Sequence, residues 1–131
     1  MNKIPADAMV VVADGEGARL FRNVGTQQSL SLKQQEHITP KDLEDDGPSG
    51  VAPPEQTGQQ TDEATFAKQL AHRLNHGALT NAYEHLVLVA DPQTLGQMRP
   101  QLHKETLQRL HGELAKTLTN SPLADIERAL G

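Results

Sequence analysis

Two uninterrupted apolar segments constrain the fold of this chain more than any other feature of its sequence. Met9–Ala13 and Leu86–Ala90 each consist of five consecutive apolar residues and are rich in valine. Such short, continuous runs are typical of strands buried on both faces, as in the centre of a parallel sheet covered by helices. The 131 residues include two Phe, one Tyr and no Trp, so the core must be aliphatic. A chain of this length fits one domain.

The residues after the first run predict two further strands. Asp14-Gly15-Glu16-Gly17 is typical of a turn, because Asp and Gly adopt turn conformations at little cost. We therefore expect a returning strand over residues 18–23. Leu30 and Leu32 then alternate with polar residues to about His37, which predicts a half-exposed edge strand.

Helical patterns surround the second apolar run. Phe66, Leu70 and Leu74 share one face of a predicted helix, with Gly77 as its expected stop. Asp91-Pro92 predicts an N-cap followed by the first residue of the next helix. Pro100 predicts a break in that helix, with a second helical piece to about residue 109. A strand over residues 110–118 and a last helix after Ser121-Pro122 complete the pattern.

This order of elements predicts one α/β domain spanning residues 1–131. Three meandering strands are followed by two helix–strand units and a final helix. Right-handed crossovers place the strand at 86–90 parallel to the strand at 9–13 and beside it. The expected sheet has five strands in the order 3-2-1-4-5, which is the ribonuclease-H-like topology.

Residues 38–61 predict a long, flexible and acidic loop. Proline and glycine are frequent in this segment. It contains one basic residue, Lys41, and five acidic residues, which gives it a charge of −4. Loops of such length are either functional or disordered. Since the net charge of the chain is −5, the remaining residues carry about −1. This balance argues against binding to duplex DNA through phosphate contacts, but it leaves RNA and protein partners open.

Several classes of protein are excluded by what the sequence lacks. Cysteine is absent, which excludes disulfides and thiolate metal sites. The longest apolar run is Ala8–Ala13, whereas a membrane helix needs about 20 residues. The first residues also lack the features of a signal peptide. We therefore expect a cytoplasmic protein that does not bind membranes.

Several short segments resemble one protein family in the same order along the chain. These segments are Val10–Gly15, Ala18–Phe21, Phe66–Ala71, Leu86–Pro92, Leu95-Gly96 and Lys116–Thr119. Together they resemble the bacterial host-attachment family, which is described as required for attachment to host cells. That family is similar to the middle domain of archaeal and eukaryotic class-I peptide release factors. The resemblance implies the topology derived above and a ribosome, RNA or protein partner.

Acidic residues form the first candidate site. If the two apolar strands are parallel neighbours, Asp14 and Asp91 lie together at their carboxyl ends, where open α/β sheets bind ligands. Glu63, at the start of the next helix, and Asp125, in the last helix, are candidates to join them. Such carboxylates could hold Mg²⁺ for phosphate hydrolysis in a ribonuclease-H-like nuclease. The alternative is local, since Asp14 suits its turn and Asp91 suits a helix cap.

A second candidate site lies at Gly58-Gln59, before the helix that contains Phe66. Release factors have a Gly-Gly-Gln loop at the corresponding place, and the alternative is an ordinary loop rich in Gly and Gln. Arg19 completes the set of candidate binding residues, although Arg19 and Arg22 lie on opposite faces of their strand and form no patch.

A third candidate is the pair His72 and His76, which are one helical turn apart and could share a metal ion. Their predicted helix face is opposite the apolar stripe, which favours a solvated face. We therefore expect a non-catalytic binding or regulatory protein without a cofactor, associated with a ribosome, RNA or a protein. The alternative is a Mg²⁺-dependent nuclease that uses Asp14, Glu63 and Asp91.

Overall fold

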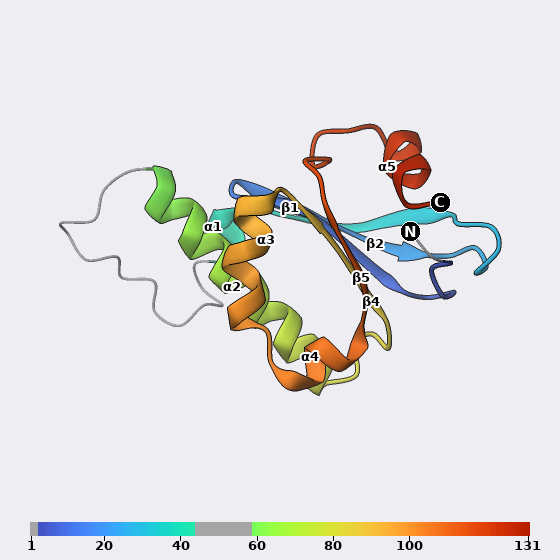
Figure 1. Ribbon diagram of the computed structural model, residues 1–131, viewed down its shortest axis with the longest axis horizontal. Helices are drawn as coiled ribbons and strands as arrows, with labels where there is room; N and C mark the ends of the chain where they lie inside the picture. The colour runs from blue at the N-terminus through green and yellow to red at the C-terminus, as the bar shows by residue number, and fades with distance from the viewer. Residues whose placement is uncertain (1–2, 44–58) are drawn as a thin grey trace.

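A computed structural model describes residues 3–43 and 59–131, with side chains from residue 65 onward in the second range. Its elements run in the order expected from the sequence (Figure 1). The strands are β1 (Met9–Asp14), β2 (Gly17–Asn23), β3 (Leu32–Ile38), β4 (Leu86–Ala90) and β5 (Leu110–Ala115). The helices are α1 (Pro40–Leu43), α2 (Gln59–Leu79), α3 (Pro92–Met98), the 3-10 turn η1 (Arg99–Gln101), α4 (Lys104–Arg109) and α5 (Leu123–Leu130).

The five strands form one mixed sheet in the order β3-β2-β1-β4-β5, which confirms the predicted order. β1 pairs antiparallel with β2 and parallel with β4, and β4 pairs parallel with β5. The two apolar runs are therefore adjacent central strands. All five residues of β4 are buried, as are Val10–Ala13 of β1. The predicted five-stranded sheet of an α/β fold is therefore present. The resemblance of its topology to that of ribonuclease H stays a prediction.

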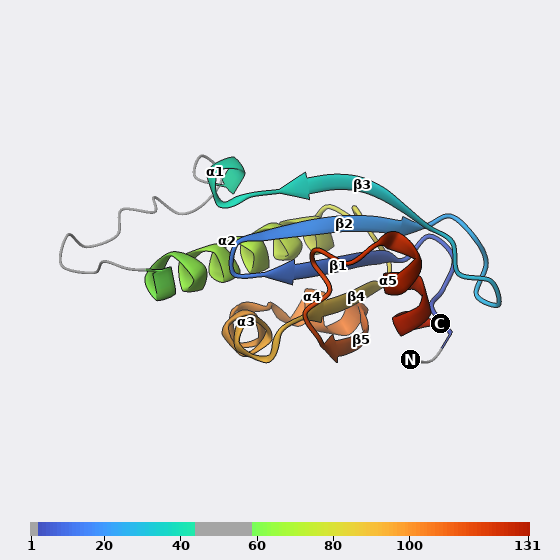
Figure 2. The same ribbon diagram turned by 90° about the horizontal axis from the view of Figure 1, so that it is seen from above.

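Helices cover the two faces of the sheet unequally. We call the face that carries α2, α3 and α4 the helical face, and the face that carries α5 the α5 face (Figure 1). Phe66, Leu70 and Leu74 of α2 are buried against the helical face, as their spacing predicts. Ile126 and Leu130 of α5 are buried against the other face. α2 has 21 residues and, at about 1.5 Å per residue, is longer than the strands. Its first turns extend past the ends of β1 and β4 (Figure 2).

Each edge strand contains a bulge. In β3, Glu36 lies opposite Leu20 and Gln34 opposite Phe21, so Gln35 is an extra residue. In β5, Leu110 lies opposite Leu86 and Gly112 opposite Val87, so His111 is the extra residue. An extra residue reverses the alternation of side chains. Consequently the apolar residues near the two ends of each edge strand project from opposite faces; in β3 they are buried (Leu32, Ile38) and in β5 half-buried (Leu110, Leu114).

Some predicted boundaries are wrong. Gly77 does not stop α2, which continues to Leu79. The reason for the glycine is close packing, because a Cβ at Gly77 would lie 2.9 Å from Cε2 of Tyr83. The predicted strand to residue 118 ends at Ala115.

The predicted loop at 38–61 is interrupted at both ends. Its first residues end β3 and form α1, and its last three belong to α2. The Asp42 carboxylate accepts hydrogen bonds from the backbone N–H and the hydroxyl of Thr39, at 2.8 and 2.9 Å, which lower the pKa of Asp42 and fix the first turn of α1. Residues 44–58 lie outside the described residues.

Candidate functional site

The carboxyl ends of β1 and β4 lie side by side and form the edge of the sheet that we call the rim. Ala13 is opposite Ala90 in the parallel pairing, so Asp14 and Asp91 follow at adjacent positions. Both continue the alternation of Val12 and Val89, which are buried on the α5 face. The prediction that these two aspartates share one edge is therefore confirmed.

Asp14 is engaged by its own turn. Its Oδ1 accepts hydrogen bonds from the backbone N–H of Glu16 at 2.8 Å and of Gly17 at 2.9 Å. A carboxylate that receives two N–H groups fixes the reversal between β1 and β2. Asp14 therefore has the local role in the turn that its sequence context offered as the alternative to binding a metal ion.

Asp91 is the N-cap of α3. Its Oδ2 accepts a hydrogen bond from the backbone N–H of Thr94 at 3.1 Å, with Pro92 as the first residue of the helix. Its Oδ1 is buried and has no hydrogen-bond partner in the described part of the chain. Within residues 3–43 and 65–131, the side chains form no group of three or more His, Asp or Glu placed to hold a metal ion.

The other acidic candidates do not add to this pair in the described structure. Asp125 lies 3.3 Å from Arg128 within α5. α5 is anchored at the opposite end of the sheet, since Glu127 Oε2 accepts the backbone N–H of Leu32, where β3 begins. Glu63 lies in α2 and its side chain is outside the described residues, as is that of Gln59, the first residue of the helix. Gly58 lies wholly outside them.

Arg19 is the candidate whose structural role is most clearly defined. Its Nη1 donates to the backbone oxygens of Thr119 at 3.1 Å and Ser121 at 2.7 Å, about one hundred residues away along the chain. Its Nε donates to Gln34 Oε1, and the guanidinium lies 5.0 Å from the centre of the Phe21 ring. Arg19 therefore holds the connection between β5 and α5 against the sheet, a role that sequence spacing did not indicate.

The rim also includes a cation that the sequence did not single out. Ala115 pairs with Ala90, so Lys116 follows β5 at the position beside Asp91, and its side chain is exposed. Lys116 is the first residue of Lys116–Thr119, one of the segments that resemble the family. Only the pairing of β4 with β5 shows that it lies at the rim. Lys116, Asp91 and Asp14 thus succeed one another across three adjacent strands.

Within the part of the chain that is described, His72 and His76 belong to no group of three or more side chains that could hold a metal ion. His76 is exposed and His72 is half-buried on α2, in agreement with a largely solvated face. Among the described residues, no helix is both long enough and apolar enough to cross a membrane.

The comparisons with known proteins support the release-factor resemblance. A family model described as bacterial archaeo-eukaryotic release factor family 12 matches residues 7–130, nearly the whole chain. The search of curated proteins found no match to this sequence. The matched range includes all five strands, α5 and every residue of the rim.

Proposed function

Because the chain belongs to bacterial archaeo-eukaryotic release factor family 12, we propose that it is a non-catalytic binding domain whose partner is the ribosome. The family description is the observation that carries this proposal, since it links the fold to translation. A ribosomal partner also implies a cytoplasmic location. Attachment to host cells would then be an indirect consequence of the binding.

The chemistry of the rim supports binding over catalysis. One oxygen of Asp14 and one of Asp91 accept backbone N–H groups of a turn and a helix, so both side chains stabilise the local fold. A catalytic carboxylate needs its oxygens directed at a substrate or a metal ion. Lys116, by contrast, is exposed beside them and can contact an RNA phosphate.

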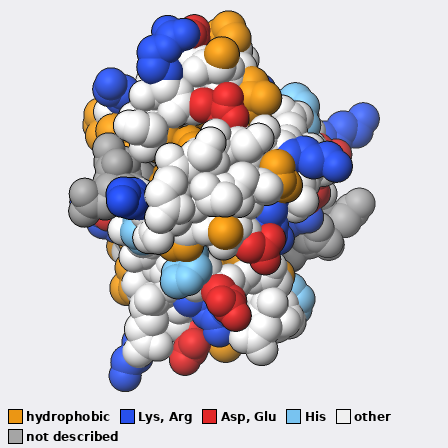
Figure 3. Space-filling view, turned by 90° about the vertical axis from the view of Figure 1, so that its right-hand side faces the viewer, with side chains coloured by type: hydrophobic (Ala, Val, Ile, Leu, Met, Phe, Trp, Pro, Cys, Tyr) orange, Lys and Arg blue, Asp and Glu red, His pale blue; other side chains and the backbone are white. Residues whose placement is uncertain are grey.

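The charge distribution suits contacts at a few points. The chain has twelve Lys and Arg residues and seventeen Asp and Glu residues. Four of the acidic residues lie in residues 44–58, so the rest of the chain is nearly neutral. On the face in Figure 3, cationic and anionic side chains are interspersed and neither forms a continuous patch. We therefore expect binding with a shallow salt dependence, since few phosphates are neutralised.

The test is co-sedimentation of the purified chain with ribosomes through a sucrose gradient. We expect the chain in the ribosomal fractions at low salt, and several-fold less of Lys116→Glu. Lys33→Glu is the matched control, since Lys33 is equally exposed but lies on β3 away from the rim. Recovery of the chain only at the top of the gradient would refute the ribosome as partner.

A separate assay addresses catalysis. The chain is incubated with labelled RNA and either Mg²⁺ or Mn²⁺, beside Asp14→Asn and Asp91→Asn. Asparagine keeps an oxygen acceptor for the same N–H groups, so the variants should retain the fold. We expect intact RNA in all samples. Metal-dependent cleavage that both variants lose would overturn the non-catalytic assignment.

A further inference from the structure

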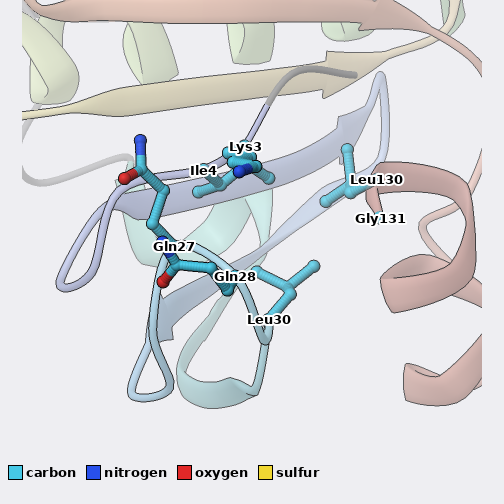
Figure 4. A pocket seen from close by; sticks show the side chains of 7 residues that line it. All are labelled: Lys3, Ile4, Gln27, Gln28, Leu30, Leu130 and Gly131. Carbon is cyan, nitrogen blue, oxygen red and sulfur yellow. The ribbon is translucent and has the colours of Figure 1, made fainter.

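A cavity of about 250 Å³ lies at the end of the sheet opposite the rim. Three segments line it: the residues before β1, the β2–β3 connection and the last turn of α5 (Figure 4). This volume equals roughly eight water molecules at about 30 Å³ each, which suits a small organic molecule rather than a macromolecule. The cavity is partly open to solvent, so its shape depends on how its walls are held.

The walls are held by a buried amide. Asn23 is 1% exposed, and its Nδ2 donates to the backbone oxygens of Ile4 at 3.2 Å and Pro5 at 3.1 Å. Its Oδ1 accepts the backbone N–H groups of Gly25 at 3.0 Å and Ser31 at 3.1 Å. One side chain therefore fixes the segment before β1 relative to both ends of the β2–β3 connection.

The third wall is attached independently. The bond from Leu32 N–H to Glu127 Oε2, 2.8 Å long, ties the start of β3 to α5, which supplies Leu130 to the cavity. The β2–β3 connection is also tight, since a Cβ at Gly25 would lie 2.2 Å from the Ser29 carbonyl oxygen. The cavity is thus a pre-formed space, the usual condition of a small-molecule site.

The lining divides into an aliphatic floor and a polar mouth. Ile4 and Leu130 are buried and Leu30 is half-buried, and none of the lining residues is aromatic. The mouth consists of Gln27, Gln28, Gly131 and the ammonium group of Lys3, all exposed. No described carboxylate lies within ion-pair distance of Lys3.

We propose that this cavity binds a short aliphatic carboxylate, with the hydrocarbon chain against Ile4, Leu30 and Leu130 and the carboxylate at Lys3. The aliphatic floor selects an apolar chain without an aromatic ring, and the ammonium group selects an anionic head. The glutamine amides can donate to the same carboxylate oxygens. This site is independent of the ribosome-binding role proposed for the rim.

The test is an NMR titration of the isotopically labelled full chain with hexanoate. Hexylamine, which has the same chain length and the opposite charge, and acetate, which lacks the chain, are the comparison probes. We expect hexanoate to shift the methyl signals of Ile4, Leu30 and Leu130 with saturation in the millimolar range. Hexylamine should bind several-fold more weakly, and acetate should shift none of these signals.

Two variants identify the cation. Lys3→Gln should weaken hexanoate binding by about two- to five-fold, the upper part of the range of an exposed charge pair. Lys33→Gln, at an exposed position outside the cavity lining, should leave it unchanged. Equal binding of hexanoate and hexylamine, an unchanged affinity in Lys3→Gln, or shifts without saturation would each overturn the proposal.

Discussion

At the scale of single residues, Tyr83 shows how one buried polar group joins two elements. Its hydroxyl donates to the backbone oxygen of Leu74 in α2 at 2.6 Å, and only 3% of the residue is exposed. The ring packs on Gly77 one turn later in the helix. Tyr83 therefore holds the loop before β4 against α2, through a hydrogen bond at Leu74 and a close contact at Gly77.

The first prediction concerns the ionisation of Tyr83. Burial raises the pKa of its phenol above the ordinary value of 10.0, because the charged form is desolvated. A raised folded-state pKa contributes stability that is complete below pH 10 and is lost as the pH rises through the folded-state value. Because the chain has one Tyr and no Trp, ultraviolet absorbance follows this group alone. Titration near pH 10 in the folded chain would contradict the burial.

The second prediction compares two helical glycines. Replacing glycine by alanine inside a helix ordinarily stabilises by about 0.5–1 kcal/mol. Gly96→Ala should follow this rule, since a Cβ there would meet nothing within 4 Å. Gly77→Ala should instead destabilise the protein by about 1–3 kcal/mol, because the new Cβ overlaps the Tyr83 ring. Urea denaturation of both variants measures the difference, and stabilisation by both would show that the ring moves freely.

At the scale of elements, the bulges decide how the edge strands bury their ends. In a strand without a bulge, Leu32 and Ile38 would project from the same face, since they are six positions apart in the sequence. With it, Leu32 packs with α5 and Ile38 packs with α2. Bulges also twist an edge away from pairing with another chain, so they protect both free edges of this sheet.

Deletion of Gln35 is the third prediction. The deletion leaves Leu32 and Ile38 five positions apart in a regular strand, so both keep their buried faces, and we expect a loss of no more than about 2 kcal/mol of unfolding free energy. Gln35→Ala, at the same exposed position, should change stability by no more than about 0.5 kcal/mol. Denaturant unfolding of the two variants provides the measurement. A loss well above about 2 kcal/mol would mean that β3 needs the bulge itself and not only the placement of its two ends.

At the scale of the whole molecule, the α5 face of the sheet is covered by α5. α5 contributes Ile126 and Leu130 to the core, and its connection to β5 is held by Arg19. Thr119 is itself 6% exposed, so this connection is part of the packed structure. Apolar contacts, the hydrogen bond of Glu127 to Leu32 and the hydrogen bonds of Arg19 therefore hold α5 to the sheet.

The fourth prediction separates these attachments. Arg19→Ala should accelerate hydrogen exchange in α5 and reduce stability by about 1.5–3 kcal/mol, the range for hydrogen bonds from a charged group. Arg22→Ala is the matched control, because Arg22 donates to Asp7 and Ala82 on the other face of β2. It should leave exchange in α5 unchanged. Similar exchange in the two variants would assign the attachment of α5 to its apolar contacts and to the hydrogen bond of Glu127.

The sequence by itself determined the features that depend on near neighbours. The apolar runs predicted the central pair of strands, and Asp14 and Asp91 predicted a turn and a cap, because each carboxylate bonds N–H groups two or three residues away. The order of elements and the handedness of crossovers were then enough to give the strand order.

Only the tertiary structure decided the features that join distant residues. The bulges depend on which face each end of an edge strand must bury, and Gly77 depends on a ring that the next loop delivers. Arg19 reaches residues one hundred positions away, and Lys116 joins the rim only through the pairing of β5 with β4. Such contacts leave no local pattern, because hydrophobic periodicity records burial but not the partner.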